Sequence, residues 1–297
     1  MTDVLRAVVL GVVEGLTEFL PVSSTGHMIL VEPLLGIPEK DPFWSGTFDV
    51  FIQIGAILAV AALFWTRLWK LTFEQADAVR RRHAPVALSL ARPGPLLGLL
   101  KAFVQEHILG KILVAFLPAV IIGMLTADFI EAHMKTTFVV ACALVVGGVA
   151  ILLIEYLVRN SKITDAASVT LTTAFLVGVA QCLAMIFPGT SRSAATIMGA
   201  LLLGLSSSAA AEFSFFLAIP TMFAAGGYSL LKHINEIDSS QLLTLAVGFA
   251  VSFIVAWLVV KVFMRFIQTH RFTSFAIYRI ILGIVVLGYF FVERGRG

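Results

Sequence analysis

Two glutamates near the N-terminus are spaced for joint chemistry inside an apolar segment. Glu14 and Glu18 stand four residues apart, so a helix would project both carboxylates from one face. In apolar surroundings the two carboxylates would repel each other and resist ionisation. We therefore expect a cation against them, either a divalent metal ion or an arginine. The alternative is a protonated glutamate that hydrogen-bonds to the backbone.

The segment that follows, PVSSTGH at residues 21–27, gathers hydroxyl groups, a glycine and an imidazole. Ser and Thr side chains at a helix start cap free N–H groups, and capping alone would explain any single hydroxyl here. Such N–H groups also attract phosphate oxygens. His27 could act as general base or acid near neutral pH. The candidate phosphate-binding residues of this loop are Ser23, Thr25 and Gly26.

A second polar interruption, PGTSRSAAT at residues 188–196, places an arginine in an apolar stretch. The guanidinium group of Arg192 matches phosphate with two donors and keeps its charge at any relevant pH. Together with hydroxyl groups and a helix start, it would make a phosphate-binding site. The alternative is that Arg192 neutralises Glu14 or Glu18 and binds nothing. The candidate phosphate-binding residues here are Gly189, Ser191, Arg192, Ser193 and Thr196.

The composition places these residues in a membrane protein. Apolar residues make up 59% of the 297 residues and charged residues 13%, with a mean hydropathy of +0.98. A soluble domain carries about 25% charged residues, so too little polar surface is present to cover a water-exposed globule. This excludes a nucleic-acid binder, a disordered chain and a disulfide-built secreted domain. Glu14 and Glu18 interrupt the N-terminal apolar run, so we expect this run to belong to the fold rather than to a signal peptide.

Six stretches are long and apolar enough to cross a bilayer as helices, which needs about 20 residues each. Two further stretches, residues 4–35 and 169–205, are apolar but broken by the polar loops described above. Two short helices joined by a polar, proline-containing loop are typical of a re-entrant hairpin. We also expect an interfacial amphipathic helix at 94–110. The six full spans are predicted at 47–66, 110–127, 136–157, 207–231, 241–266 and 274–292.

Loop charges and a weak internal similarity predict an inverted repeat. The connection at 67–101 is rich in Arg and Lys and is therefore expected in the cytoplasm, which makes spans 47–66 and 207–231 run in opposite directions. Each follows a broken segment, and an offset of 167 residues aligns the two segments, placing Ser24 on Ser191. We expect one membrane domain over 1–297, with repeats of about 1–157 and 158–297, whose broken segments meet near the midplane.

Other charged residues in apolar surroundings are candidates for supporting roles. Asp49 and Glu212 lie near the starts of the spans that follow the broken segments, where they would support the fold or the site indirectly. Arg279 is expected either to extend to the membrane interface or to pair with an acid.

At this level of detail the sequence resembles the bacterial undecaprenyl-diphosphate phosphatases of the BacA or UppP family. The residues that carry the resemblance are EGLTEFLPVSSTGH at 14–27 and PGTSRS at 188–193, with FDVFIQIG at 48–55, AEFSF at 211–215 and FAIYR at 275–279. The resemblance implies an inner-membrane enzyme that removes the terminal phosphate of a polyprenyl diphosphate. It further implies a divalent metal ion (Mg or Ca), a site that faces the periplasm, recycling of the lipid carrier for the cell wall, and a link to bacitracin resistance.

Residue by residue, the resemblance places the site on the residues already singled out. Glu14 and Glu18 would bind the metal, and Arg192 with its neighbouring hydroxyls would hold the diphosphate. We favour Ser24 as nucleophile over direct attack by water, with His27 as base or as acid for the leaving oxygen. The family often has Glu where this chain has Asp49. The catalytic candidates are Glu18, Ser24, His27 and Arg192.

The competing function is a secondary transporter or lipid flippase. Inverted repeats, broken helices and a membrane carboxylate pair all suit transport. Clustered hydroxyls with His27 and Arg192 suit phosphate chemistry better. The expected partners are the polyprenyl diphosphate and membrane lipids, not nucleic acid, and a homodimer is left open.

Overall fold

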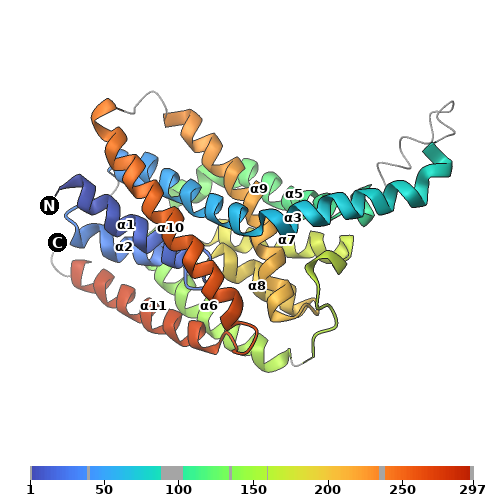
Figure 1. Ribbon diagram of the computed structural model, residues 1–297. Coiled ribbons are helices and arrows are strands. Elements are labelled where there is room, and N and C mark those ends of the chain that lie inside the picture. The colour runs from blue at the N-terminus through green and yellow to red at the C-terminus, as the bar shows by residue number, and fades with distance from the viewer. Residues whose placement is uncertain are drawn as a thin grey trace.

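The structure is a computed structural model that describes residues 2–38, 41–87, 103–133, 136–158, 160–233 and 238–294. Within these ranges the chain forms helices and no β-strand, apart from one isolated bridge between Ile163 and Leu205. Figure 1 shows the helices lying along one another in a single bundle. The prediction of an all-α protein is confirmed.

Six helices of the described chain are long and apolar enough to cross a membrane, and each overlaps one of the six predicted spans. Many of their outward side chains are large and apolar, including Leu125, Val146 and Leu243, which are 76%, 67% and 64% exposed. Such a surface is stable against lipid, not water. The chain is therefore a multi-pass membrane protein. The six spans belong to α3 (Asp49–Ala87), α5 (Ile108–His133), α6 (Thr137–Leu157), α9 (Ser207–His233), α10 (Leu242–Phe266) and α11 (Thr273–Arg294).

The first of these helices is much longer than expected. A π-helix at Phe43–Phe48 leads into α3, which continues to Ala87, well past the predicted end of the span at residue 66. Figure 1 shows the end of α3 projecting beyond the rest of the bundle. The expectation that the connection begins at residue 67 is wrong, because residues 67–87 continue the helix with polar side chains. The rest of that connection, and residues 94–102 of the predicted interfacial helix, lie outside the described residues.

Four short helices form the two broken segments. The first segment consists of α1 (Asp3–Thr17) and α2 (Ser24–Leu34), and the second of α7 (Leu171–Ile186) and α8 (Arg192–Leu202). With a rise of about 1.5 Å per residue, none of them is long enough to span a bilayer alone. The predicted interruptions are therefore confirmed, whereas the re-entrant depth and the inverted repeat stay predictions.

Glycines allow the first helix of each broken segment to lie close to a long helix. A Cβ at Gly11 of α1 would come within 2.7 Å of the carbonyl oxygen of Gly248 in α10. A Cβ at Gly178 of α7 would come within 2.0 Å of the carbonyl oxygen of Ala115 in α5. These two helix pairs, α1 with α10 and α7 with α5, are among the most extensive of the bundle, together with α3 with α10 and α6 with α11.

The second helices of the two segments align with a register that differs by one residue from the predicted one. Ser23 caps α2 and Ser191 caps α8, and each helix is 11 residues long, which gives an offset of 168 instead of 167. The expectation that Ser24 matches Ser191 is therefore wrong in this part. The second loop holds one more residue after its proline than the first, so Ser24 corresponds to Arg192.

Candidate active site

The two broken segments meet through Glu18, which lies in the first loop. One carboxylate oxygen, Oε1, lies 3.2 Å from Nη2 of Arg192 on α8. The other, Oε2, accepts a hydrogen bond of 2.7 Å from Oγ of Ser24 on α2. The side chains of Glu18 and Arg192 are each 12% exposed, so this ion pair is largely desolvated. The structure thus brings together an acid from the first loop, a hydroxyl from α2 and a guanidinium group from α8.

The guanidinium group of Arg192 has capacity left for a ligand. Nη2 also lies 3.2 Å from the sulfur of Met222, and the group stands over the ring of Phe19 at 5.4 Å from its centroid. Nη1 is buried and has no hydrogen-bond partner among the described residues. A buried charged donor without a partner is costly, so Nη1 favours an anion held beside it.

Glu14 is the second acid of the site and is 2% exposed. Its Oε1 is buried without a hydrogen-bond partner in the described chain, and the charges of Glu18, Asp49 and Arg192 act on it. No three His, Cys, Asp or Glu side chains of the described residues converge on one point as a metal cage would require. A magnesium site commonly uses one or two carboxylates plus substrate phosphates, however, and the free oxygen of Glu14 fits such a site.

Ser23 and Ser191 hold the starts of α2 and α8 in the same way. The Oγ atom of Ser23 accepts from the N–H of Gly26, and that of Ser191 accepts from the N–H of Ala194. Both serines have a positive φ, 71° and 70°, and no other non-glycine residue of the described chain does. Such backbone costs about 1–3 kcal/mol and persists only where the surroundings fix it, often at a functional site.

The remaining hydroxyls of the second loop are engaged within the protein. Ser193 donates to the carbonyl oxygen of Leu20 at 2.8 Å and lies 2.9 Å from Oγ of Ser191. Thr196 is fully buried, donates to the carbonyl oxygen of Arg192 and contacts the hydroxyl of Ser214. These contacts tie α8 to the first loop and to α9. Direct phosphate binding by Ser193 and Thr196 stays a prediction.

His27 faces a partner that the sequence analysis did not find. Its Nε2 lies 2.6 Å from the hydroxyl of Tyr278 on α11, its Nδ1 lies 2.7 Å from the carbonyl oxygen of Ser23, and the two rings stack. Tyr278 falls in one of the motifs that carry the family resemblance, but nothing local in the sequence pairs it with a histidine 251 residues away. Within the described residues no hydrogen bond joins His27 to Ser24 or Glu18.

The glycines and the threonine of the loops have different surroundings. Gly26 is buried, and a Cβ there would meet the side chain of Leu144 at 2.8 Å. Gly189 has φ of +94°, and a Cβ there would lie 2.6 Å from the carbonyl oxygen of Val140. Gly189 therefore requires glycine, whereas at Gly26 a larger residue would displace the end of the Leu144 side chain. Thr25 is exposed and free to meet a ligand.

Arg279 contradicts the expectation made for it. The side chain neither extends to the interface nor pairs with an acid: it is completely buried. Its donors bind the carbonyl oxygens of Pro21 in the first loop and of Gly189 and Thr190 in the second. It also donates to the carbonyl oxygens of Ala143 and Leu144 in α6. A buried arginine bound to backbone oxygens leaves no trace in sequence spacing, which is why the role was missed.

Two other polar groups lie away from this site. Glu212 pairs with Arg67 at 3.0 Å, and Arg67 also pairs with Asp165, which bears out a fold-supporting role for Glu212.

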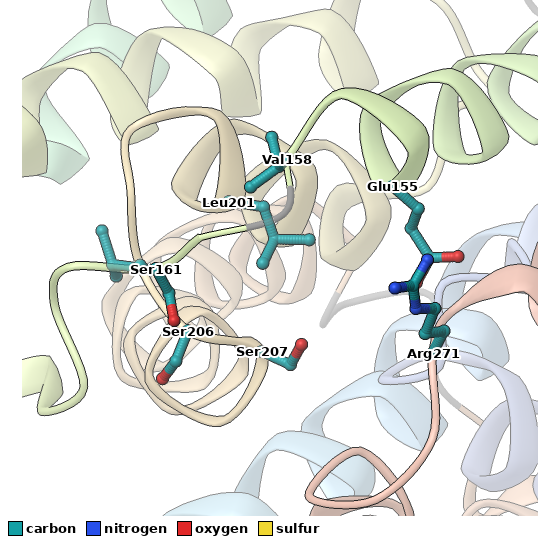
Figure 2. Close-up of a pocket in the computed structure, with 8 residues that line it drawn as sticks. Glu155, Val158, Ser161, Leu201, Ser206, Ser207 and Arg271 are labelled. Carbon is teal, nitrogen blue, oxygen red and sulfur yellow. The ribbon is translucent and has the colours of Figure 1, made fainter.

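A pocket lies at the opposite end of α8, where Figure 2 shows Arg271 extending toward Glu155. It contains none of the predicted site residues. Its lining residues are Glu155, Val158, Ser161, Leu201, Leu205, Ser206, Ser207 and Arg271.

Comparison with known proteins agrees with this geometry. A family model described as bacitracin resistance protein BacA matches residues 7–285. A protein named undecaprenyl-diphosphatase from Rhizorhabdus wittichii is 45% identical over 285 residues, covering 96% of this chain and 97% of that protein. Proteins of the same name from Albidiferax ferrireducens (44% identical, 95% and 94% covered) and Rhodopseudomonas palustris (43% identical, 97% and 97% covered) are also similar. The chain belongs to the BacA family.

Proposed function

We propose that this protein hydrolyses undecaprenyl diphosphate to undecaprenyl phosphate and inorganic phosphate, and so recycles the lipid carrier for cell-wall synthesis. The observation that carries the proposal is the contact of Glu18 with both Ser24 and Arg192. It joins a candidate base, a nucleophile and a phosphate ligand in one desolvated place, as phosphoryl transfer requires. The similar proteins named above are phosphatases by name, and the transporter alternative has no support.

Ser24 is the proposed nucleophile because its hydroxyl already donates to a carboxylate. Glu18 would accept the proton of Oγ as the oxygen attacks the terminal phosphorus, and the bond to the bridging oxygen would break. Undecaprenyl phosphate leaves, and water then hydrolyses the phosphoserine. Since Glu18 is the partner of Ser24, His27 is left for the leaving-group side, where its pair with Tyr278 would hold the ring.

Arg192 would bind the diphosphate through its free Nη1 while Nη2 stays on Glu18. Glu14 and Glu18 are the residues that would hold the divalent ion, Mg²⁺ or Ca²⁺, which when bound neutralises charge on the phosphate oxygens. Both oxygens of Glu18 already have protein partners, so Glu14 offers the more available ligand. We further propose that the headgroup enters from the periplasmic side while the prenyl chain lies among the apolar helices.

Phosphate release from undecaprenyl diphosphate by the purified full-length protein tests the activity. We expect turnover that stops when a chelator is added and returns with Mg²⁺ or Ca²⁺. A folded protein that releases no phosphate under any of these conditions would contradict the proposal.

The nucleophile is tested separately with substrate labelled in the terminal phosphate. We expect transient label on Ser24 and a large loss of turnover in Ser24→Ala. Undiminished turnover in Ser24→Ala would instead assign the attack to water.

A further inference from the structure

Arg279 touches both loops of the active site without belonging to either. Its Nη1 donates to the carbonyl oxygen of Thr190 at 2.8 Å and to that of Pro21 at 3.3 Å. Its Nη2 donates to the carbonyl oxygen of Gly189 at 3.1 Å. The loop that contains Glu18 and the loop that precedes Arg192 are thus held by a single side chain from α11.

The bond to Thr190 also decides where the next peptide N–H points. In a trans peptide the carbonyl and the following N–H point in opposite directions. With the oxygen of Thr190 turned to Arg279, the N–H of Ser191 is turned away from it, and no hydrogen bond of the described residues uses that N–H. A free N–H directly before the first turn of α8 adds a donor to those of the helix start.

The backbone of Ser191 has an intrinsically unfavourable conformation. Ser191 has φ of 70° and ψ of 119°, which an L-residue with a side chain rarely adopts. Only groups that restrain the neighbouring peptides can maintain it. Arg279 binds the two peptide oxygens immediately before Ser191, those of Gly189 and Thr190.

We propose that Arg279 is a positioning residue that holds both loops so that the N–H of Ser191 and the start of α8 face the diphosphate of the substrate. The proposal rests on the proposed phosphatase activity for its substrate, but its contacts are independent of it. Arg279 itself is shielded from the ligand because it is completely buried. Its effect on the headgroup is exerted through the backbone.

Arg279→Lys tests the proposal because lysine keeps the charge but cannot reach five carbonyl oxygens at once. We expect KM for undecaprenyl diphosphate to rise about tenfold, the scale of one lost hydrogen bond to a charged group. The dissociation constant of methylene diphosphonate, a headgroup probe that cannot be hydrolysed, should rise by the same factor. A merely structural role would lower the amount of active enzyme and leave both constants unchanged.

Gly147→Ala provides a second route if the lysine variant does not fold. A Cβ at residue 147 would lie 2.3 Å from Nη2 of Arg279, so the guanidinium group must shift while its charge remains. The matched control is Gly148→Ala, whose Cβ would meet Ile280 and the backbone of Ala276 at the same interface of α6 and α11. We expect Gly147→Ala to weaken diphosphonate binding and Gly148→Ala to change only the melting temperature.

The outcomes separate the two proposals. Turnover in the wild type with unchanged constants in Arg279→Lys and Gly147→Ala would overturn the positioning role and leave the phosphatase activity in place. Absence of turnover in the wild type, with diphosphonate binding that is weakened in the variants, would overturn the activity and leave the positioning role in place.

Discussion

The second helices of the two broken segments have equal length and equal caps but very different surroundings. In α8 eight of the eleven residues are buried, because α7, α9 and α6 pack against it. In α2 only Gly26 and Met28 are buried, and Leu34 at its end is 83% exposed. Figure 1 places α8 within the bundle and α2 at its side, beside α1.

This difference indicates that the two segments contribute differently to the candidate site. The buried helix provides Arg192, whose side chain is 12% exposed and is held by Glu18, Met222 and Phe19. The less buried helix provides Ser24, and its exposed residues, Thr25, Pro33 and Leu34, are where we propose that the lipid approaches. A membrane enzyme with a lipid substrate needs both properties, since preorganised charge requires rigidity and the substrate requires a path from the bilayer.

The largest expected effect comes from Arg192, on the rigid side. Arg192→Lys should lower turnover more than tenfold, because lysine has a single nitrogen and cannot contact both Glu18 and the ligand as Nη2 and the free Nη1 do. The measurement is kcat for phosphate release at saturating substrate. Lys111→Met, which removes another buried cation that donates to the backbone of Ala167, is the control and should keep kcat. Near-wild-type turnover in Arg192→Lys would reduce Arg192 to a counter-ion of Glu18.

Glu14→Gln tests Glu14 as a ligand of the divalent ion in the same site. The change replaces a buried carboxyl group that has a free oxygen with an amide, which is a weaker metal ligand, so we expect the activating concentration of Mg²⁺ to rise about tenfold or more. Titration of activity with the metal measures it. Glu212→Gln, in the separate ion pair with Arg67, should leave the metal titration unchanged. An identical titration in Glu14→Gln would remove Glu14 from the metal site.

Two threonine variants separate the buried helix from the exposed one. Thr196→Val removes a buried hydroxyl that bonds to Arg192 and Ser214, and should cost about 1 kcal/mol of unfolding free energy. Thr25→Val alters an exposed side chain and should leave stability unchanged. Detergent-unfolding titrations of the two variants measure the difference. Equal losses would contradict the contrast drawn between α8 and α2.

The smallest effect concerns the two cap serines. Ser23→Ala and Ser191→Ala lose the cap while the strained φ remains, so each should cost about 1 kcal/mol. The glycine variants lose the same cap but relieve the strain, and should be more stable than the alanine variants by about 1 kcal/mol. Melting temperatures of the four proteins check this. Alanine variants as stable as the glycine variants would show that the positive φ carries no strain.

Much of this fold could be predicted from the sequence because membrane helices are marked by length and hydropathy. The six spans and the two breaks follow from that signal. A lone charge is costly in apolar surroundings, so the sequence also predicted that Arg192 would lie near an acid such as Glu18. The extension of α3 to Ala87 was missed because its polar residues lack that signal. The register of the second loop was missed because loops tolerate an extra residue.

The contacts of Arg279 and Tyr278 could not be predicted for a different reason. Arg279 binds backbone oxygens, which every residue type presents alike, and its partner Pro21 lies 258 residues away. Tyr278 and His27 are likewise joined only by the packing of α11 against α2. Spacing within one segment reports which face a side chain occupies, but not which distant backbone it meets.

Arg279 gives the site a property beyond the alignment of loops. Within the described chain its positive charge is balanced only by carbonyl dipoles, with no acidic partner, and it is fully shielded from solvent. In a medium of low polarisability such a charge produces an electrostatic potential that salt in the surrounding water screens little. Salt therefore weakens the bonds of Arg279 to the two loops little, and the site gains resistance to high ionic strength as well as alignment.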